Sequence, residues 1–332
     1  MREERVAIGP LRLESGETLL AVEQLVSIYG TPRSDGSNVV VAEHALTGSG
    51  RIAEWWPGMV GEGALFDPSQ WCVIGINALG GCYGSTGPHS FLAQSGHREF
   101  PRVTVTDIVR AEMRALAQLG IERVALTIGG SLGGMRALQW ALDAPERVAC
   151  AVMIGAHDHH SAMGLALNAL QREALELDPV RGLRLARKIA MLTYKSEELL
   201  ARRHDRRPDR YGKPRFDVEG YLEHQADLFA QRMDSQSYAA LSHAMDSFDV
   251  RGRRLQGAHS PALIFVGITA DWLFRAGDVA EAARRFARNG FEARYLELRS
   301  DHGHDAFLAE TAALRDLLEP VLEPIFAQRL RP

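Results

Sequence analysis

The segment Val124 to Trp140, VALTIGGSLGGMRALQW, restricts the fold of this chain more than any other stretch. An apolar run at 124–128 leads directly into a glycine-rich stretch around Ser131, after which apolar residues recur at helical spacing. The segment is therefore predicted to form a strand, a tight turn and a helix. Glycines flank the serine because side chains beside the tip of so sharp a turn would collide.

Such a turn gives Ser131 the position of a nucleophile. It lifts the hydroxyl off the sheet and places it at a helix N-terminus, where the free N–H of Leu132 can stabilise negative charge on a substrate carbonyl oxygen. A bare Gly-x-Ser-x-Gly match is weak evidence in a chain with 31 glycines. The position between an apolar strand and an amphipathic helix is what favours a catalytic serine.

Composition limits the classes of partner. With 332 residues, 46% hydrophobic and 24% charged, the chain is long enough for a large globular domain with an insertion. A net charge of −4 gives no electrostatic basis for binding nucleic acid or an anionic membrane, so we expect small-molecule partners. We find neither the apolar core of a leader peptide nor 18 consecutive apolar residues, which predicts a cytoplasmic protein.

The cysteines give no indication of a metal or disulfide. Cys72, Cys82 and Cys150 are an odd number and lack the spacing of metal ligands. We therefore expect no metal site.

Apolar runs and helical periodicity alternate through most of the chain. The first 40 residues alternate apolar and polar side chains, as in an antiparallel lead-in of short strands. Helical periodicity at 107–119 and 278–289 separates compact apolar runs, which argues for a parallel sheet covered on both faces. The predicted strands are 39–41, 71–76, 124–128, 148–154, 262–267 and 292–298.

The pattern changes between residues 158 and 255. This block has helical periodicity at 183–192, 218–232 and 235–245 and no convincing strand. We predict an α/β-hydrolase core formed by 1–157 and 256–332, with 158–255 as a helical lid insertion that excludes water and shapes the pocket. Its arginine-rich run, 201–210, is either a solvated loop or a contact for the phosphates of a large cosubstrate.

Three groups stand just past the ends of predicted parallel strands, in the chain order Ser131, Asp271 and His304. A parallel sheet brings these strand ends to one edge, and the order is that of an α/β-hydrolase triad. His304 would take the serine proton, and Asp271 would fix the imidazole tautomer. Two alternatives stay open: Asp271 only caps a turn, or His302 is the base.

A second oxyanion donor is predicted in the loop after strand 39–41. In hydrolase-like sheets an early loop supplies this N–H, and here the loop contains Leu46-Thr47-Gly48. The alternative is a plain turn. Further along, Asp305 is expected to open the C-terminal helix as an acid in its first turn.

Several segments together resemble the homoserine O-acetyltransferase family of α/β-hydrolase-fold acyltransferases. They occur in the family's order along nearly the whole chain. These segments are HALTG (44–48), NALGGCYGSTGP (77–88), GGSLGGMRALQW (129–140), ARKIAMLTYKSEE (186–198), GITADWLF (267–274) and GHDAFL (303–308).

The resemblance implies a ping-pong reaction in methionine biosynthesis, with no bound cofactor and with acetyl-CoA as cosubstrate. Ser131 would accept the acetyl group, and the γ-hydroxyl of L-homoserine, deprotonated by His304, would then collect it. The resemblance also places the oxyanion hole at the backbone N–H groups of Leu46 and Leu132.

The resemblance further implies how the amino acid is held. Arg187 would bind the substrate carboxylate, with Tyr194 nearby, Thr47 near the oxyanion and Asp305 at the ammonium group. A guanidinium suits a carboxylate and a carboxylate suits an ammonium, so both charged ends of an amino acid would be fixed. A homodimer through the lid helices is implied as well.

Three alternatives remain for the reaction. Relatives use succinyl-CoA or accept serine, and an extra arginine such as Arg136 or Arg275 could pair with the free carboxylate of a succinyl group. The same triad serves water as readily as an alcohol, so an esterase or thioesterase is the other alternative. Without amino-acid contacts at Arg187 and Asp305, the hydrolase would be favoured.

Overall fold

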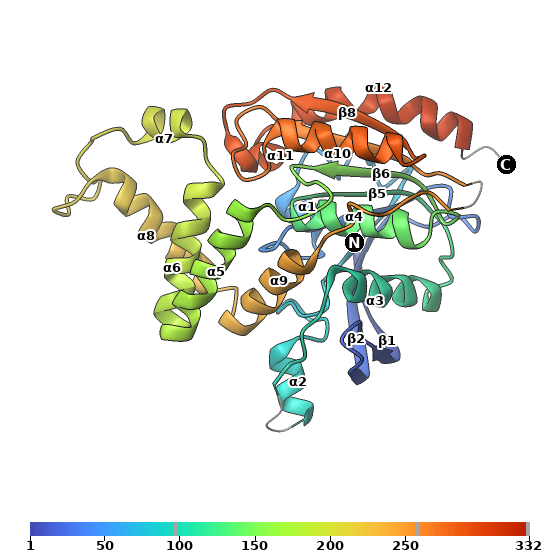
Figure 1. Cartoon of the computed structure of the whole chain (residues 1–332), viewed down its shortest axis with the longest axis horizontal. Helices are drawn as coiled ribbons and strands as arrows, with labels where there is room; N and C mark the ends of the chain where they lie inside the picture. The colour runs from blue at the N-terminus through green and yellow to red at the C-terminus, as the bar shows by residue number, and fades with distance from the viewer. Residues whose placement is uncertain (96–98, 257–258, 330–332) are drawn as a thin grey trace.

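The computed structural model describes residues 1–95, 99–256 and 259–329, and its centre is an eight-stranded sheet (Figure 1). The strands lie in the order β1-β2-β4-β3-β5-β6-β7-β8. The first two pair antiparallel, β2 is antiparallel to β4, and all neighbours from β4 to β8 are parallel. The strands are β1 Arg2–Arg12, β2 Thr18–Tyr29, β3 Val39–Glu43, β4 Cys72–Ile76, β5 Val124–Gly130, β6 Val148–Ile154, β7 Ala262–Ile268 and β8 Glu292–Leu298.

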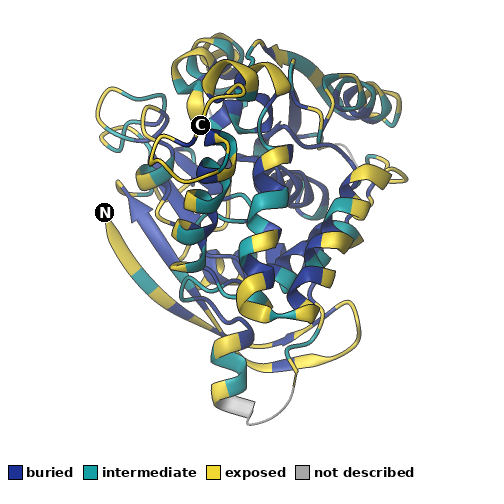
Figure 2. Cartoon of the chain, turned by 90° about the vertical axis from the view of Figure 1, so that its left-hand side faces the viewer, coloured by how far each residue is buried: buried dark blue, intermediate teal, exposed yellow. Residues whose placement is uncertain are grey.

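Burial along the strands follows from helices covering both sheet faces. Every residue of β3, β4, β5 and β7 is buried, which explains why these strands appear in the sequence as unbroken apolar runs. Buried and more exposed residues mix along β1, at the outer edge of the sheet (Figure 2). The predicted antiparallel lead-in and parallel α/β sheet are confirmed.

Helices pack on the two faces of the sheet in two separate hydrophobic clusters. One face is covered by α3 Val105–Gln118, α4 Leu132–Asp143 and α10 Ala276–Arg288, and the other by α1 Ile52–Trp55, α11 Ala306–Ala309 and α12 Thr311–Arg329. The short helix α2 Pro88–Ser95 lies apart from these layers, at the bottom of Figure 1. Among the described residues, none of the helices is both long and apolar enough to cross a membrane.

Five helices follow β6 and extend to the left of the sheet in Figure 1. The predicted helical block is therefore present, although the prediction did not single out its first helix or the short α7. That the block acts as a lid, excluding water and shaping the pocket, stays a prediction. The helices are α5 Ala162–Leu177, α6 Pro179–Thr193, α7 Glu197–Arg203, α8 Asp217–Ala230 and α9 Ser235–Ser247.

The chain leaves the core for this helical block and returns from it at one place. His159 and Asp249 form an isolated antiparallel bridge. Beside it the N–H of Val250 donates to the carbonyl of Asp158 at 2.8 Å, and the N–H of His160 donates to the carbonyl of Phe248 at 3.3 Å. We call these two paired segments, 158–160 and 248–250, the base of the helical block.

Candidate active site

Ser131 stands at the turn between β5 and α4 in a backbone conformation that few residues other than glycine adopt. Its φ is 58° and its ψ −125°, which costs about 1–3 kcal/mol. Its N–H donates to the carbonyl of Ile154 at 2.9 Å. A Cβ atom at Gly129 would lie 2.6 Å from the carbonyl oxygen of Glu43, and one at Gly133 only 2.1 Å from it. The crowding explains the glycines around the serine.

His304 and Asp271 form a buried pair next to this turn. Nδ1 of His304 lies 2.7 Å from Oδ2 of Asp271, whose Oδ1 accepts the N–H groups of Leu273 and Phe274 at 2.9 Å. The carboxylate therefore orients the ring and favours the tautomer with the proton on Nδ1. Nε2 is buried and has no hydrogen-bond partner within the part of the chain that the structure describes. This leaves a lone pair for a serine proton.

Gly155 joins the pair to the nucleophile. A Cβ atom there would lie 3.2 Å from Oδ2 of Asp271 and 3.3 Å from Nδ1 of His304. The preceding residue, Ile154, accepts the N–H of Ser131. The turn after β6 thus contacts all three predicted triad residues, which the fold brings to the carboxyl edge of the sheet. Sequence reasoning missed Gly155, since a single glycine after a strand is common.

Aromatic rings surround the imidazole of His304. Phe274 stacks on it with ring centroids 5.3 Å apart, and Tyr194 and Phe307 follow at 5.6 and 5.9 Å. Burial lowers the pKa of His304, but the charge of Asp271 more than offsets this, and the pKa is raised from its ordinary value. His302 instead places Nδ1 2.8 Å from Glu310, which argues against it as the base.

The two predicted oxyanion donors lie in two segments next to Ser131, the start of α4 and the loop after β3. Leu132 is the first residue of α4, and Leu46 belongs to the loop after β3. Neither N–H donates a hydrogen bond to any residue that the structure describes. The loop is fixed by His44, whose Nδ1 lies 2.8 Å from the carbonyl of Ala45 and whose Nε2 accepts the N–H of Ala78 at 3.0 Å. Burial, followed by the charge of a nearby arginine, lowers the pKa of His44 to about 3, so the ring stays neutral.

Arg136 lies beneath this loop and corrects one prediction. Its side chain is fully buried and forms ion pairs with Glu43 and Glu112. It also donates to the carbonyls of His44 and Ile76, at 3.2 and 3.0 Å. The suggestion that Arg136 pairs with a succinyl carboxylate is therefore wrong, because its guanidinium is enclosed among groups of the chain itself. Its place is structural, tying α4 to the oxyanion loop.

Burial and the neighbouring carboxylate of Glu112 affect the charge of Glu43. Burial raises the pKa of Glu43 well above its ordinary value, and the Arg136 guanidinium opposes this. With two carboxyl groups against one guanidinium, a proton on Glu43 makes the cluster neutral. Nε1 of Trp140 donates to Glu112 at 2.9 Å and completes the cluster.

Arg187 offers a cation that pairs with none of the described carboxylates and lies close to the predicted triad. Its guanidinium carbon lies 4.9 Å from the ring centre of Phe229 and 5.8 Å from that of Tyr194, which itself neighbours His304. Nε and Nη1 are buried and have no hydrogen-bond partner among the described residues. Burial raises the pKa of Tyr194 to about 12, so this phenol stays neutral beside the arginine. The arrangement suits a carboxylate ligand.

Asp305 and Thr47 lie near the same region, each contacted by a basic residue that sequence reasoning did not assign. Nζ of Lys195 lies 2.7 Å from Oδ2 of Asp305. Nη1 of Arg232 donates to the carbonyl of Thr47. Nothing in the local sequence marks these basic residues, since their partners are 110 and 185 positions away.

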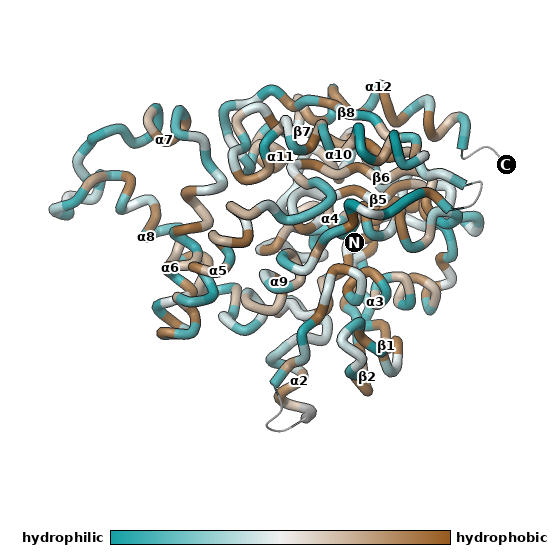
Figure 3. Tube along the Cα trace, in the orientation of Figure 1, coloured by the Kyte–Doolittle hydropathy of each residue, from teal (hydrophilic) through white to brown (hydrophobic). Residues whose placement is uncertain are grey.

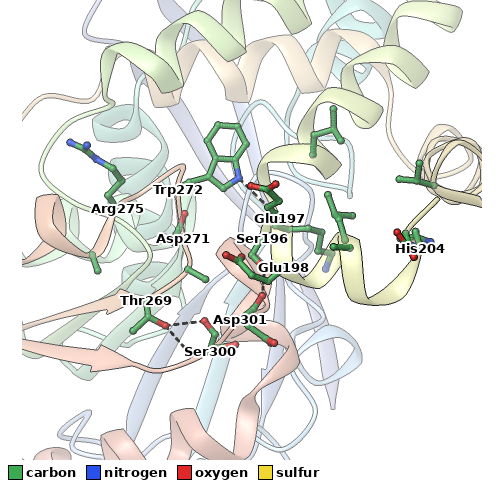
Figure 4. Close-up of a pocket in the computed structure, with 18 of the residues that line it drawn as sticks. Ser196, Glu197, Glu198, His204, Thr269, Asp271, Trp272, Arg275, Ser300 and Asp301 are labelled. Carbon is green, nitrogen blue, oxygen red and sulfur yellow. Dashed lines mark hydrogen bonds between the residues drawn. The ribbon is translucent and has the colours of Figure 1, made fainter. Parts of the chain in front are cut away.

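An open cavity of about 1260 Å³ lies between α6–α8 and the loops after β7 and β8. Figure 4 shows Asp271 and Trp272 on one side and Ser196, Glu197 and Glu198 on the other. Arg275 also lines this cavity, and its guanidinium pairs with Asp278 at 2.8 Å. Asp271 lines this cavity, but its carboxylate is buried, and Ser131, His304 and Arg187 are not among the lining residues.

The arginine-rich run beside this cavity is largely occupied by partners within the chain. Arg202 pairs with Asp301, and Arg210 makes two hydrogen bonds to Asp217. The solvated-loop alternative fits these contacts better than a bare phosphate site does.

Comparison with known proteins agrees with this geometry. The family model of the α/β-hydrolase fold matches residues 38–311. A homoserine O-acetyltransferase of Gluconobacter oxydans is 37% identical, over 90% of this chain and 87% of its own. The chain belongs to the homoserine O-acetyltransferase family. A relative named homoserine O-succinyltransferase, from Bordetella avium, is also 37% identical, over 95% of this chain and 86% of its own.

Solved structures extend the likeness to the whole fold. The homoserine O-acetyltransferase of Staphylococcus aureus is 26% identical, covers 97% of this chain and 95% of its own, and has a TM-score of 0.81. The acetyl esterase MekB, 22% identical, covers 98% and 97% with a TM-score of 0.80. The second likeness shows the fold alone. Membership of the homoserine O-acetyltransferase family, predicted from the sequence motifs, is thus confirmed, while donor and acceptor need separate arguments.

Proposed function

We propose that this protein transfers an acetyl group from acetyl-CoA to the γ-hydroxyl of L-homoserine through an acyl-serine intermediate, a step of methionine biosynthesis. The observation that carries the proposal is the unpaired guanidinium of Arg187 beside Tyr194 and thus one ring away from His304. An amino acid bound there by its carboxylate would direct its side chain toward the triad. The names of the relatives support homoserine as that amino acid.

The first half-reaction uses the buried pair. Nε2 of His304 accepts the hydroxyl proton of Ser131 as Oγ attacks the thioester carbonyl, and Asp271 stabilises the imidazolium. The N–H groups of Leu46 and Leu132 bind the oxyanion. The C–S bond then breaks, CoA leaves as a thiol with the proton from His304, and the acetyl group remains on Ser131.

The second half-reaction reverses these roles. His304 takes the proton of the homoserine hydroxyl, and the resulting oxygen nucleophile attacks the acetyl-serine carbonyl. Oγ of Ser131 leaves with the proton from His304, and O-acetylhomoserine is released. The aromatic rings of Phe274, Tyr194 and Phe307 help to keep water from the acyl group.

The charges near the site support acetyl as the donor group. Of the two arginines that the sequence offered for a succinyl carboxylate, Arg136 is enclosed with Glu43 and Glu112. Arg275 is exposed on the surface and already pairs with Asp278, so neither arginine forms a buried site for a succinyl carboxylate. Because a relative is named homoserine O-succinyltransferase, succinyl-CoA is the alternative donor in the assay described below.

Exposed apolar side chains support a homodimer through the helical block. Figure 3 shows hydrophobic stretches along these helices, and large apolar patches on a surface commonly mark an interface. Of the large exposed apolar side chains in the described residues, many lie on α5, α6 and α8: Met163, Leu165, Leu170, Leu177, Val180, Leu185, Leu192 and Leu228. Light scattering at micromolar concentration would give twice the chain mass for the dimer, and a monomer mass would reject it.

One assay separates the functional alternatives. Release of CoA thiol is measured from acetyl-CoA and from succinyl-CoA, each with L-homoserine, with L-serine or with no acceptor, and the amino-acid product is weighed by mass spectrometry. The proposal expects homoserine-dependent release from acetyl-CoA and a product carrying one acetyl group. Succinyl product would change the donor, and serine product the acceptor. Equal release without an amino acid would replace the transferase by a thioesterase.

A further inference from the structure

Three consecutive residues after β6 place potential metal ligands together. One donor atom from each of His157, Asp158 and His159 lies within 4.8 Å of the other two. Nδ1 of His157 is 3.6 Å and Nδ1 of His159 is 2.9 Å from Oδ1 of Asp158. The ligand atoms of a tetrahedral zinc site with bonds of about 2.0–2.1 Å are about 3.4 Å apart, and the two distances to Oδ1 of Asp158 lie on either side of that spacing.

The imidazole of His157 supplies an independent observation. His157 is 1% exposed, and neither Nδ1 nor Nε2 has a hydrogen-bond partner among the described residues. A buried polar group without a partner costs free energy, so buried imidazole nitrogens are normally bonded. A cation held with Asp158 and His159 would give Nδ1 of His157 a ligand bond.

The surroundings fit a coordinated carboxylate. Oδ2 of Asp158 accepts a hydrogen bond from Nη1 of Arg285 on α10, which leaves Oδ1 facing the two imidazoles. Metal-binding carboxylates are commonly held by such a hydrogen bond from behind.

We infer that His157, Asp158 and His159 form a site for a divalent transition-metal cation, of which Zn²⁺ is the best match, at the base of the helical block. Two imidazoles and one carboxylate are ligands that Zn²⁺ accepts, and a water molecule can complete four-coordination. Cysteine spacing gave no indication of this site, because all three donors are nitrogen or oxygen. The expectation of no metal site rested on the cysteines alone.

The site is separate from the triad but close to it. The ring of Phe274 lies between them, 5.4 Å from His157 and 5.3 Å from His304 by ring centroids. The proposed acyl transfer uses none of the three residues of this cluster, so the inference stands or falls independently of it. Because Val250 donates to the carbonyl of Asp158, the ion would sit where the helical block joins the core.

Calorimetric titration of the chelator-treated full chain with ZnSO₄ tests the site directly, with Co²⁺ absorption as a report on geometry. We expect one equivalent of Zn²⁺, a rise in the thermal midpoint, and a tetrahedral Co²⁺ spectrum. His157→Gln, Asp158→Asn and His159→Gln should each weaken binding by about 10-fold or more, as is typical when a ligand or its support is lost.

The control is His204→Gln in α7's C-terminal cap, because His204 also pairs with a carboxylate, Nδ1 lying 2.8 Å from Asp217. This variant should bind Zn²⁺ like the unmodified chain. If Asp158→Asn fails to fold without the Arg285 pair, His159→Gln decides, since its ring is partly exposed. Absence of micromolar binding, or binding unchanged in His157→Gln and His159→Gln, would overturn the inference.

Discussion

The ammonium group of Lys195 lies 2.7 Å from the carboxylate of Asp305, at the position that the family resemblance assigns to the ammonium of the substrate. Both side chains are mostly buried, so the pair is little screened by water. If Asp305 binds the substrate ammonium as the resemblance implies, a bound amino acid must share Asp305 with this lysine or replace it. On that assignment, Lys195 competes with the substrate's ammonium group for Asp305.

Removing the competitor should strengthen acceptor binding. We expect Lys195→Met to lower the KM for homoserine several-fold, and Asp305→Asn to raise it about 10-fold, equivalent to about 1.4 kcal/mol. Thiol release during acylation, measured as a burst without acceptor, should change little in either variant. A higher KM in Lys195→Met would mean that the lysine positions Asp305 instead of competing.

Arg187→Met tests the carboxylate contact. The change keeps much of the packing on Phe229 and Tyr194 but removes the charge, so the KM for homoserine should rise by about 10- to 100-fold, the effect of losing a charge-assisted hydrogen bond of about 1.5–3 kcal/mol. Arg184→Met is the matched control on the same helix, because Arg184 pairs with Glu223 and Asp227. An equal rise in the KM for homoserine in both variants would mean that Arg187 has only a structural role.

Gly155→Ala tests the crowding around the pair. The residue has φ of 51°, and its Cβ would lie 3.2 Å from Oδ2 of Asp271, so the carboxylate or the imidazole must shift. We expect kcat to fall by roughly 10- to 100-fold, as a displacement of catalytic groups does, with the KM for homoserine nearly unchanged. Gly277→Ala is the control, since nothing lies within 4 Å of its Cβ position. Wild-type kcat in Gly155→Ala would contradict the proposed packing.

The raised pKa of His304 predicts how activity depends on pH. Only the neutral imidazole accepts a proton, so acylation slows as His304 becomes protonated. Because the pKa of His304 is raised above 6.5, this slowing begins at a higher pH than it would with an ordinary histidine. In Asp271→Asn the charge is lost while burial remains, and the pKa should drop below 6.5. Nuclear magnetic resonance titration of the His304 ring measures both values. An unchanged pKa in the variant would show that Asp271 does not set it.

We expect loss of the Arg136 side chain to lower the free energy of unfolding, because the residue lies in the core and outside the reacting groups. Arg136→Met leaves the carboxyl groups of Glu43 and Glu112 buried without their cation, which costs about 3–5 kcal/mol. The triple change with Glu43→Gln and Glu112→Gln removes both carboxyl groups, and with them the charge that has lost its cation, and should recover part of this loss. Urea unfolding followed by circular dichroism measures both. If Arg136→Met alone kept full stability, the buried carboxyl groups of Glu43 and Glu112 would not carry a charge that depends on this arginine.

The sheet could be predicted because its signals are local. The bounds of β6 and β8, 148–154 and 292–298, match the predicted strands, since each run is rich in apolar residues and is followed by a glycine or by a polar stretch. The end of the chain is different. Asp305 precedes only the four residues of α11, and the long helix begins at Thr311 and contains Pro320 and Pro324. Burial of its apolar stripe against the sheet stabilises a helix that prolines disfavour.

That the three predicted triad residues lie at one edge of the sheet was predictable for a similar reason, whereas the contacts that support them were not. Ser131, Asp271 and His304 each follow a strand whose end the sheet topology fixes. The roles of Lys195 and Gly155 depend on contacts between segments far apart in the chain, and no local pattern distinguishes these residues from others of their kind. The resemblance pointed to Arg187 and Asp305 as contacts of the amino acid. Only the structure shows that Arg187 has no hydrogen-bond partner for Nε and Nη1 among the described residues.

The antiparallel bridge between His159 and Asp249 has a consequence for how such a chain can be rebuilt. Because the outgoing and returning segments are already side by side, a turn of a few residues can join them without moving β6 or the segment before β7. We therefore expect that the helices between them can be exchanged as one unit while the core that holds Ser131 and His304 is retained, provided that the contacts of Lys195, Ser196 and Arg202 with 301–305 are rebuilt.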